Sequence, residues 1–381
     1  MEDERTHLPR TGRPTRRRRA AAIVGSALVV AGCSLVATPG SPPVVDVPLS
    51  PVQPMGYVVC PTAVTPVELH TRTPEAAIPL PVQGTPPLGS FAMTTSPDGR
   101  WAFVVTQSTP AGGIPRAVLV PIDLATQLAG RPIVLPGSGG THAVAVTHDG
   151  RTVLAAVGTT IVPVDVATHA VGTPLELGAG RTVFGMALSP TSPTLYVLVP
   201  GGVIPVDTTT ARSGPEIATG LTVSSVSSPH GVVVSADGST VYVVGQGGAD
   251  YGGRLMPISA VTGAVGTVTG FDQFGISDPA AAALTGDGTM LLVADSANNW
   301  IVPVPTIGPP TPLPPVRLPV GSGSADTGTD HPTDIAVGPG DTGAFVVAGL
   351  DSVLPYSPTT GVFGRAVRVC SGATSMAVAS P

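Results

Sequence analysis

One short phrase recurs seven times along the chain: an apolar residue, a proline and a second apolar residue. Consecutive copies are 55, 42, 42, 52, 46 and 52 residues apart. A period of this length, with small irregularities, is typical of an array of supersecondary units whose loops differ in length. The chain is therefore predicted to be built from seven repeated units. The prolines of the phrase are Pro66, Pro121, Pro163, Pro205, Pro257, Pro303 and Pro355.

A second phrase accompanies most of these prolines, namely two apolar runs separated by a turn that often contains Asp-Gly. Examples are the turn at 95–99 followed by the run 101–105, and the turn at 235–238 followed by the run 241–244. Asp-Gly between apolar runs indicates a β-hairpin, because Asp and Gly tolerate the positive φ that the turn needs. Each unit is predicted to have four strands: A before the turn, B after it, C around the proline and D beyond it.

The two ends of the chain carry fragments that complete one another. Residues 55–59, 64–67 and 77–80 match strands B, C and D without a strand A, whereas residues 375–381 match strand A. A seventh unit assembled from both ends closes the array into a ring and covers the sheet edges that an open array exposes. The predicted fold class is all-β: a seven-bladed β-propeller over residues 55–381, with four antiparallel strands per blade and the last blade closed by the N- and C-terminal strands.

The cysteines agree with this closure. Cys60 ends strand B of the seventh blade and Cys370 lies just before its strand A. The end of B and the start of A are neighbours in such a hairpin, so a disulfide between the two cysteines is expected in an exported protein. The alternative is two unrelated buried thiols.

The N-terminal segment is of another kind. Residues 16–19 are all arginine, residues 20–31 are apolar but too short to span a bilayer, and Cys33 follows Val-Ala-Gly. This pattern resembles a bacterial lipoprotein signal, which implies that residues 1–32 are removed and that Cys33 is lipidated. Residues 33–54 are then a flexible tether, and the protein is held at the extracytoplasmic face of the cell membrane. An ordinary secretory signal with an incidental cysteine is the alternative, and export by either the Sec or the twin-arginine route is open.

Composition narrows the possible partners. The chain has no lysine, and seven of its 18 basic residues precede residue 20. Without those seven and the three acids at positions 2–4, 11 basic and 21 acidic residues remain, a net charge of -10. Such an acidic chain argues against binding to nucleic acid, and leaves the lipid anchor as the sole expected contact with the membrane. The composition also favours a GC-rich genome, such as that of an actinobacterium, and the protein is expected to be a monomer.

The hairpin at 235–244, followed by Met256-Pro257-Ile258 and Thr262-Gly263, resembles the YVTN family of β-propeller repeats. The sequence Val120-Pro121-Ile122-Asp123 fits the same pattern with proline in a serine position. A proline inside strand C removes a backbone donor, so we expect it at a strand end, at a bulge, or where its N–H has no partner. The resemblance implies the fold. It leaves the function open, because related propellers include lactonases, lyases, dehydrogenases and binding scaffolds.

Histidines are the first candidates for a functional site. In many propellers the ligand face carries the D-to-A and B-to-C loops. When the blades are aligned on their turns, His142 and His230 share one position, and His331 and Asp278 fall two residues earlier in their own blades. We expect these histidines to hydrogen-bond neighbouring blades; direct ligand contact and a metal site are the alternatives.

Long loops are the second candidates, and they lie at 106–116, 245–254, 270–279 and 321–332. Aromatic and acidic residues gather in three of them although aromatics form only 4% of the chain, which suggests a recognition surface; solvated loops with incidental acids are an equal alternative. The ligand-binding candidates are Asp250, Tyr251, Phe271, Asp272, Phe274, Asp278, Asp330 and His331.

The predicted function is a lipid-anchored, extracytoplasmic binding or scaffold module for a protein or glycan partner in the cell envelope. The sequence contains no nucleophile elbow, paired-carboxylate motif or phosphate loop, and it predicts neither a metal nor a cofactor. The alternative is a lactonase- or lyase-like propeller enzyme at the mouth of the central channel. His142, His230 or His331 would be its general acid or base.

Overall fold

The computed structural model describes residues 54–84, 86, 91–140, 143–222, 231–247, 252–319, 331–338, 343–349 and 351–379. The chain divides into two units, Met1–Pro39 and Gly40–Pro381, and every described residue belongs to the second. The predicted signal peptide at 1–32, Cys33 and all of the predicted tether except Pro54 lie outside the described residues. Within the described residues no helix is long and apolar enough to cross a membrane.

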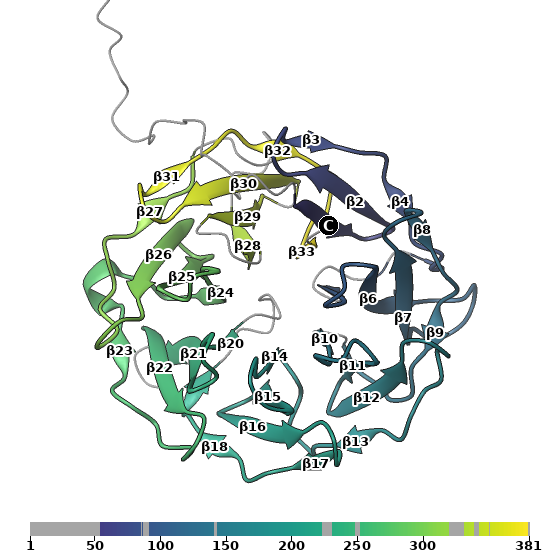
Figure 1. Cartoon of the computed structure of the whole chain (residues 1–381), viewed down its shortest axis with the longest axis horizontal. Coiled ribbons are helices and arrows are strands. Elements are labelled where there is room, and N and C mark those ends of the chain that lie inside the picture. The colour runs from purple at the N-terminus through teal and green to yellow at the C-terminus, as the bar shows by residue number, and fades with distance from the viewer. Residues whose placement is uncertain are drawn as a thin grey trace, which may run out of the picture. The chain divides into compact units, whose positions relative to one another are not determined.

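The described strands form seven antiparallel sheets arranged in a ring, as Figure 1 shows. This confirms the predicted fold class. We number the blades in chain order and count as blade 7 the one that joins both ends. Blade 1 has β5 (Ala92–Thr95), β6 (Trp101–Ser108), β7 (Arg116–Asp123), β8 (Leu128–Ala129) and β9 (Ile133–Val134). Blade 2 has β10 (Val144–Val146), β11 (Thr152–Val157), β12 (Thr160–Asp165) and β13 (Leu175–Glu176). Blade 3 has β14 (Gly185–Leu188), β15 (Thr194–Val199), β16 (Gly202–Asp207), β17 (Arg212–Ser213) and β18 (Ile217–Ala218).

The remaining four blades complete the ring. Blade 4 has β19 (Leu221–Thr222), β20 (Val232–Val234), β21 (Thr240–Gly247), β22 (Gly253–Ser259) and β23 (Thr269–Gly270), followed by the 3-10 helix η1 (Asp272–Phe274). Blade 5 has β24 (Pro279–Leu284), β25 (Met290–Asp295), β26 (Trp300–Pro305) and β27 (Val316–Arg317). Blade 6 has β28 (Pro332–Ala336), β29 (Ala344–Ala348), β30 (Ser352–Ser357), β31 (Val362–Phe363) and β32 (Val367–Arg368). Blade 7 has β1 (Met55–Cys60), β2 (Ala63–Glu68), β3 (Thr73–Pro74), β4 (Ile78–Pro79) and β33 (Ser375–Ala379).

The Asp-Gly turns form the predicted A–B hairpins, but only the glycine adopts the positive φ that was expected of both residues. Gly99 and its counterpart Gly238 have φ of 66° and 71°, whereas the aspartates are not among the residues with positive φ. Asp98 instead accepts hydrogen bonds from the Ser96 hydroxyl and from the Arg100 N–H. These bonds lower the pKa of Asp98, with the Ser96 hydroxyl as the largest cause. The aspartate therefore holds the turn together while the glycine supplies its conformation.

The repeated prolines sit in the middle of strand C, opposite a central residue of strand B, as in the pair Phe103 and Pro121. Each proline carbonyl accepts an N–H from the outer part of its blade; for Pro121 the donor is Gly130, at 2.7 Å. The N–H and C=O of a strand residue point toward the same neighbour, so the missing proline N–H faces outward too. The outer strand is interrupted there, because β8 ends at Ala129 and β9 begins at Ile133. The proline therefore faces the outer strand at its interruption and takes nothing from the continuous ladder between strands B and C.

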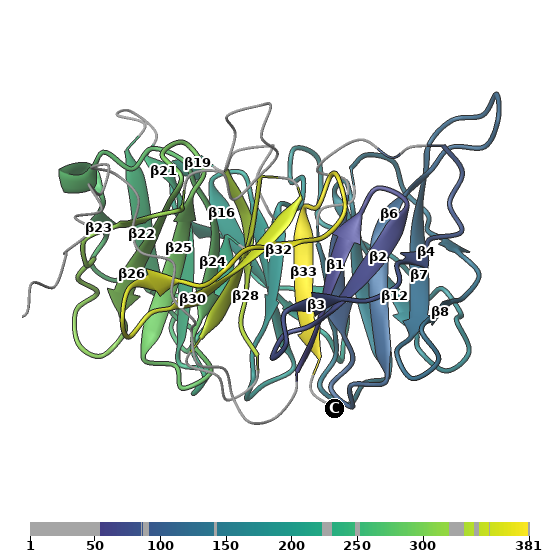
Figure 2. The same cartoon turned by 90° about the horizontal axis from the view of Figure 1, so that it is seen from above.

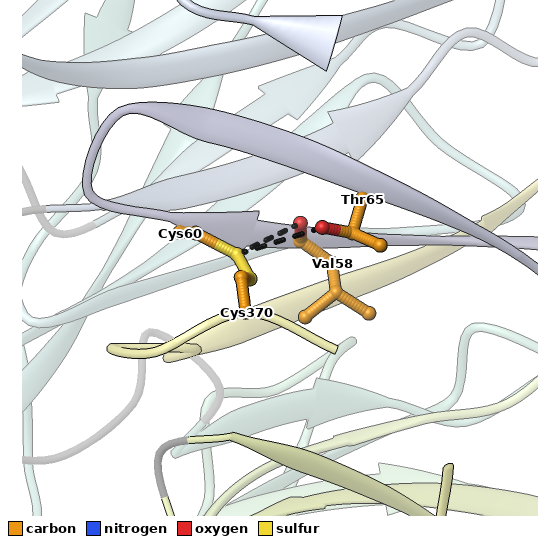
Figure 3. The surroundings of a disulfide bond; sticks show 4 residues. All are labelled: Val58, Cys60, Thr65 and Cys370. Carbon is orange, nitrogen blue, oxygen red and sulfur yellow. Dashed lines mark hydrogen bonds between the residues drawn. A yellow bond between two sulfur atoms is a disulfide. The ribbon is translucent and has the colours of Figure 1, made fainter. Parts of the chain in front are cut away.

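Blade 7 closes the ring as predicted. The C-terminal strand β33 pairs antiparallel with β1, with Met55 opposite Ala379 and Val59 opposite Ser375. Cys60 and Cys370 form a disulfide with their Cα atoms 6.2 Å apart, and the Thr65 hydroxyl lies 3.9 Å from the Cys60 sulfur (Figure 3). Closure therefore has both a covalent and a hydrogen-bonded component.

A buried carboxylate adds a third link to the closing strand. Asp334 of β28 is fully buried, and its Oδ2 accepts the Met376 N–H of β33 at 2.9 Å. The other oxygen, Oδ1, accepts the Ile335 N–H at 2.8 Å. Asp334 of blade 6 thus fixes the beginning of β33, the C-terminal strand of blade 7.

The hydrophobic core is divided among the interfaces between successive blades. One cluster joins blades 4 and 5 through residues such as Val244, Phe271 and Val302, and the described residues contain a comparable cluster at each of the other interfaces. Residues of strand B alternate between the two neighbouring interfaces because successive side chains of a strand point to opposite faces. The rigid framework therefore lies between the blades, and the loops at the two ends of the ring are left for function.

Candidate functional site

The site candidates lie at the end of the ring that carries the B-to-C and D-to-A loops, which we call the upper face. It is the upper side in Figure 2, where the hairpin of β6 and β7 and the 3-10 helix η1 project. Because both loop types begin or end next to inner strands, residues from several blades can meet there.

A polar cluster crosses blades 4 to 6 on this face. Asp278 precedes β24, and its carboxylate accepts a hydrogen bond from the Ser296 hydroxyl and a long one of 3.5 Å from the Gln246 amide. The Ser296 N–H in turn donates to the Asp278 carbonyl at 3.0 Å. We call the set Gln246, Asp278, Asp295, Ser296, Asn298 and His331 the blade-5 cluster.

His331 joins this cluster from blade 6. Its Nδ1 lies 2.5 Å from the Ser296 carbonyl oxygen, and only a protonated Nδ1 can bond a carbonyl. The Nε2 atom has no hydrogen-bond partner among the described residues and belongs to an exposed side chain. The structure thus brings His331 together with Asp278 through Ser296.

Asp295 anchors the cluster from below. Its Oδ1 accepts the Asp278 N–H at 3.0 Å and its Oδ2 accepts the Asn298 amide at 2.6 Å. The same Asn298 amide also donates to the Gly275 carbonyl at 3.1 Å. Burial raises the pKa of Asp295, and these hydrogen bonds oppose that rise only in part. A carboxylate that is costly to bury thus fixes two loops of the upper face in one arrangement.

The loop at 270–278 presents its aromatic residues unequally. Phe271 is fully buried in the core between blades 4 and 5, so its ring is not offered to a ligand. Phe274 is half-buried against the same core, and Asp272 of η1 accepts a 2.8 Å ion pair from Arg254. The Asp272 side chain is 62% exposed, so this pair adds little to stability. It orients η1 at the rim of the upper face.

Trp300 is a surface candidate that the sequence reasoning missed. It begins β26 directly after the B-to-C turn, is half-buried, and packs on the core cluster that also supports Phe274. The chain has only two tryptophans. A tryptophan next to a loop of the ligand face could have been noticed from that position alone.

Several predicted site residues lie outside the described part of the chain, namely His142, His230, Asp250, Tyr251 and Asp330. The structure therefore does not test whether the histidines converge. Among the described residues no group of three or more His, Cys, Asp or Glu is placed to hold a metal ion. The Ser296 hydroxyl donates to Asp278, while the His331 ring contacts the Ser296 carbonyl, so these three do not form a serine–histidine pair of the kind that activates a nucleophile. What the described cluster offers is a set of fixed donors and acceptors for a ligand.

Fold and site together define the class: a seven-bladed β-propeller with a polar cluster on its loop face. Among solved structures it is similar to Kuenenia stuttgartiensis hydrazine synthase, with a TM-score of 0.60, 18% identity, and 77% of this chain and 90% of that chain covered. It is also similar to a functionally unknown protein from Desulfotomaculum acetoxidans DSM 771, with a TM-score of 0.59, 14% identity, and coverage of 86% and 99%. A third match is the Cps50 (Swd1) β-propeller domain of Myceliophteria thermophila, with a TM-score of 0.54, 15% identity, and coverage of 74% and 86%.

At these identities the likeness shows the fold alone. The chain matches no protein-family model, and the search of curated proteins finds no match.

Proposed function

We propose that this chain is a lipid-anchored, extracytoplasmic β-propeller that binds a protein or glycan partner of the cell envelope at its upper face. The observation that carries the proposal is the blade-5 cluster, in which Asp278, Asn298 and His331 are held in place by hydrogen bonds before any ligand arrives. Preorganised polar groups lower the entropy cost of binding, because fewer side chains have to be ordered.

Half-exposed aromatic side chains beside the cluster support the same function. Phe274 and Trp300 are supported from below by the core between blades 4 and 5 and keep part of their surface at the upper face. Aromatic residues provide much of the binding energy in recognition surfaces, since they bury a large area with few rotatable bonds. Fixed polar groups next to such rings suit a binding surface better than a catalytic site, whose nucleophile and base would have to touch.

The proposed location of the protein in the cell rests on its N-terminal segment. Its arginines, apolar run and Cys33 resemble a lipoprotein signal, and the disulfide of blade 7 suits an oxidising compartment outside the cytoplasm. The resemblance of the hairpins to YVTN-type repeats and the lysine-free composition support a bacterial, actinobacterial origin. Acidic charge on the exported part leaves the lipid as the expected membrane contact.

Site-specific photo-crosslinking tests the proposal. A photoreactive phenylalanine analogue replaces Phe274 in the full chain, expressed in a bacterium that processes lipoproteins and supplied with the envelope of the source organism. The matched control carries the analogue at Val261, which is 87% exposed in the turn after β22 at the opposite end of the ring. We expect one discrete adduct from position 274 and none from position 261, and we expect Asp278→Asn to reduce its yield several-fold. Equal adducts from both positions, or none from 274, would contradict binding at the upper face.

A further inference from the structure

The outer side of blade 5 carries a proline-rich segment where the other blades begin strand D. Residues 309–315 read Pro-Pro-Thr-Pro-Leu-Pro-Pro and connect β26 with β27 on the outside of the ring (Figure 1). In each of the other six blades the chain that follows strand C pairs with its end, as a short strand or as a single bridge such as Val164 with Val171. The described residues of blade 5 contain no such pair, and β27 pairs with the start of β26 alone. The proline-rich segment thus replaces the lower half of strand D.

Proline chemistry restricts the conformation of this segment. Each of its five prolines has φ fixed at about -65° and lacks an N–H. Thr311 and Leu313 each precede a proline, which disfavours the helical region for both. The residues at 310–315 have no regular secondary structure, and none of them has a positive φ. These constraints favour a polyproline II helix, which has three residues per turn and no internal backbone hydrogen bonds.

Two hydrogen bonds hold the proline-rich segment on the ring. The Leu313 N–H donates to the Pro303 carbonyl at 2.9 Å, and the Pro310 carbonyl accepts the Thr269 hydroxyl of blade 4 at 3.1 Å. In five other blades the residue that makes the bond of Leu313 is a glycine, such as Gly130. Blade 5 therefore adds a leucine side chain at this fixed point, and Leu313 is 39% exposed.

Exposure along the segment follows the period of three. Thr311, Pro314 and Arg317 are exposed at a spacing of three residues, whereas Pro312 is buried. A polyproline II helix has three edges, because it has three residues per turn. One edge is therefore packed on the ring, and the edges that carry Leu313 and Pro314 are open to a partner.

A positive charge follows the segment. Arg317 of β27 is exposed, and no carboxylate within the described residues forms an ion pair with it. Without the N-terminal arginines the chain has 21 acidic and 11 basic residues, so carboxylates are plentiful. A negative group on a partner can therefore pair with Arg317.

We propose that the proline-rich segment, with Arg317, is the docking ligand for a protein module that has an aromatic-lined groove and an acidic rim. Grooves of this type bind proline-rich chains in the polyproline II form. The aromatic side chains pack on Leu313 and Pro314, and the acidic rim pairs with Arg317. Because the ring already holds the segment in place, binding costs less conformational entropy than binding of a free peptide. The surface lies on the outside of blade 5 and is separate from the blade-5 cluster.

NMR of an isotope-labelled, recombinant WW domain that binds Pro-Leu-Pro ligands tests the proposal, with the unlabelled full chain as titrant. We expect the groove residues of the domain to shift, with a dissociation constant on the order of 100 μM. Leu313→Gly introduces the residue found in five other blades, and it should weaken binding by about fivefold because it removes apolar contact area. Arg317→Glu should weaken binding by about tenfold, since it replaces attraction to the acidic rim by repulsion.

Arg365→Glu is the matched control. Arg365 is exposed on the neighbouring blade and follows Gly364, the counterpart of Leu313, so the charge change is the same outside the proline-rich segment. This variant should bind as the wild type does. The proposal is overturned if the groove residues do not shift up to about 1 mM chain, if Leu313→Gly binds as tightly as the wild type, or if Arg365→Glu weakens binding as much as Arg317→Glu. None of these results bears on crosslinking from position 274, so the upper-face function stands or falls separately.

Discussion

Removal of the Cys60–Cys370 disulfide is the most direct test of how this ring is held closed. The bond joins residues 310 positions apart, so it ties nearly the whole propeller into one covalent loop. Cys60 is buried at the end of β1, and Cys370 lies shortly before β33, the strand that completes the same sheet. The double variant Cys60→Ala/Cys370→Ala opens this loop while leaving every backbone pair of the blade in place.

The expected loss of stability follows from the length of the loop. Cross-linking restricts the unfolded chain, and the loop-entropy relation gives an upper value of about 6 kcal/mol for a loop of this length. Engineered and native cross-links commonly deliver less, so we expect the free energy of unfolding to fall by about 2 to 6 kcal/mol. The native ring should still form, because β33 keeps its ladder with β1 and Asp334 keeps the Met376 N–H.

Guanidinium unfolding followed by tryptophan fluorescence measures this loss, since Trp101 and Trp300 report on blades 1 and 5. Circular dichroism in buffer should be unchanged in the variant, and Cys33→Ala should leave the unfolding midpoint of the mature fold where it is. Thiol titration of the denatured, unreduced chain should find the blade-7 cysteines blocked. A loss below about 1 kcal/mol, or free thiols at both positions in the wild type, would refute the reasoning.

Three further outcomes are expected. The pKa of Asp237 is lowered to about 2, chiefly by the Ser235 hydroxyl, so its contribution to stability is complete above the unfolded value of 3.8 and is lost as the pH falls toward 2. The melting temperature of Asp237→Asn should therefore lie below that of the wild type at pH 6 and approach it as the pH falls to about 2. A difference in melting temperature that stays constant between these two pH values would exclude this linkage. Gly130→Ala places a Cβ 3.1 Å from Cγ of Pro121, so it should cost about 1 kcal/mol and be partly rescued in Pro121→Ala, with a coupling of about 0.5 kcal/mol in a double-mutant cycle. Cys33→Ser should abolish incorporation of a labelled fatty acid and release the protein from the membrane fraction, and retention of both label and location would rule out the lipoprotein assignment.

The architecture could be predicted from the sequence because the repeat records it. A proline in every strand C and an Asp-Gly in most A–B turns are imposed by local backbone chemistry, and local chemistry is what a sequence shows most directly. The pairing of β1 with β33 followed from the complementary fragments at the ends. The reason that strand C tolerates proline did not follow, because it depends on the gap between β8 and β9 in a neighbouring strand.

The candidate site was predictable only in part. Asp278 and His331 were selected from their place in the repeat, and the structure joins them through Ser296. Phe271 was grouped with its neighbours as a loop residue, although the chain turns its ring into the core between blades 4 and 5. Whether a loop side chain points inward depends on the packing of the next blade, and no periodicity within a loop reveals that.

Asp295 occupies a position of the repeat at which the residue differs from blade to blade. It lies three residues after Leu292, the residue of β25 that faces the repeated proline Pro303. The same position in the other blades is occupied by Cys60, Thr106, Val157, Val199, Gly245 and Ala348. One position of the repeat thus carries the disulfide in blade 7, the buried carboxylate of the candidate site in blade 5, and small or apolar residues elsewhere.

This position lies at or near the upper end of strand B, so a side chain there contacts the loops of its own blade. A cysteine at the position fixes the loop that leads into β33, and an aspartate fixes the loops that carry Asp278 and Asn298. The A–B turns vary in the same way at the other end of the ring, where Thr191 of blade 3 replaces the turn aspartate. In a repeat protein the scaffold tolerates such single replacements because neighbouring blades keep the core, and each replacement can therefore give one blade a chemistry of its own.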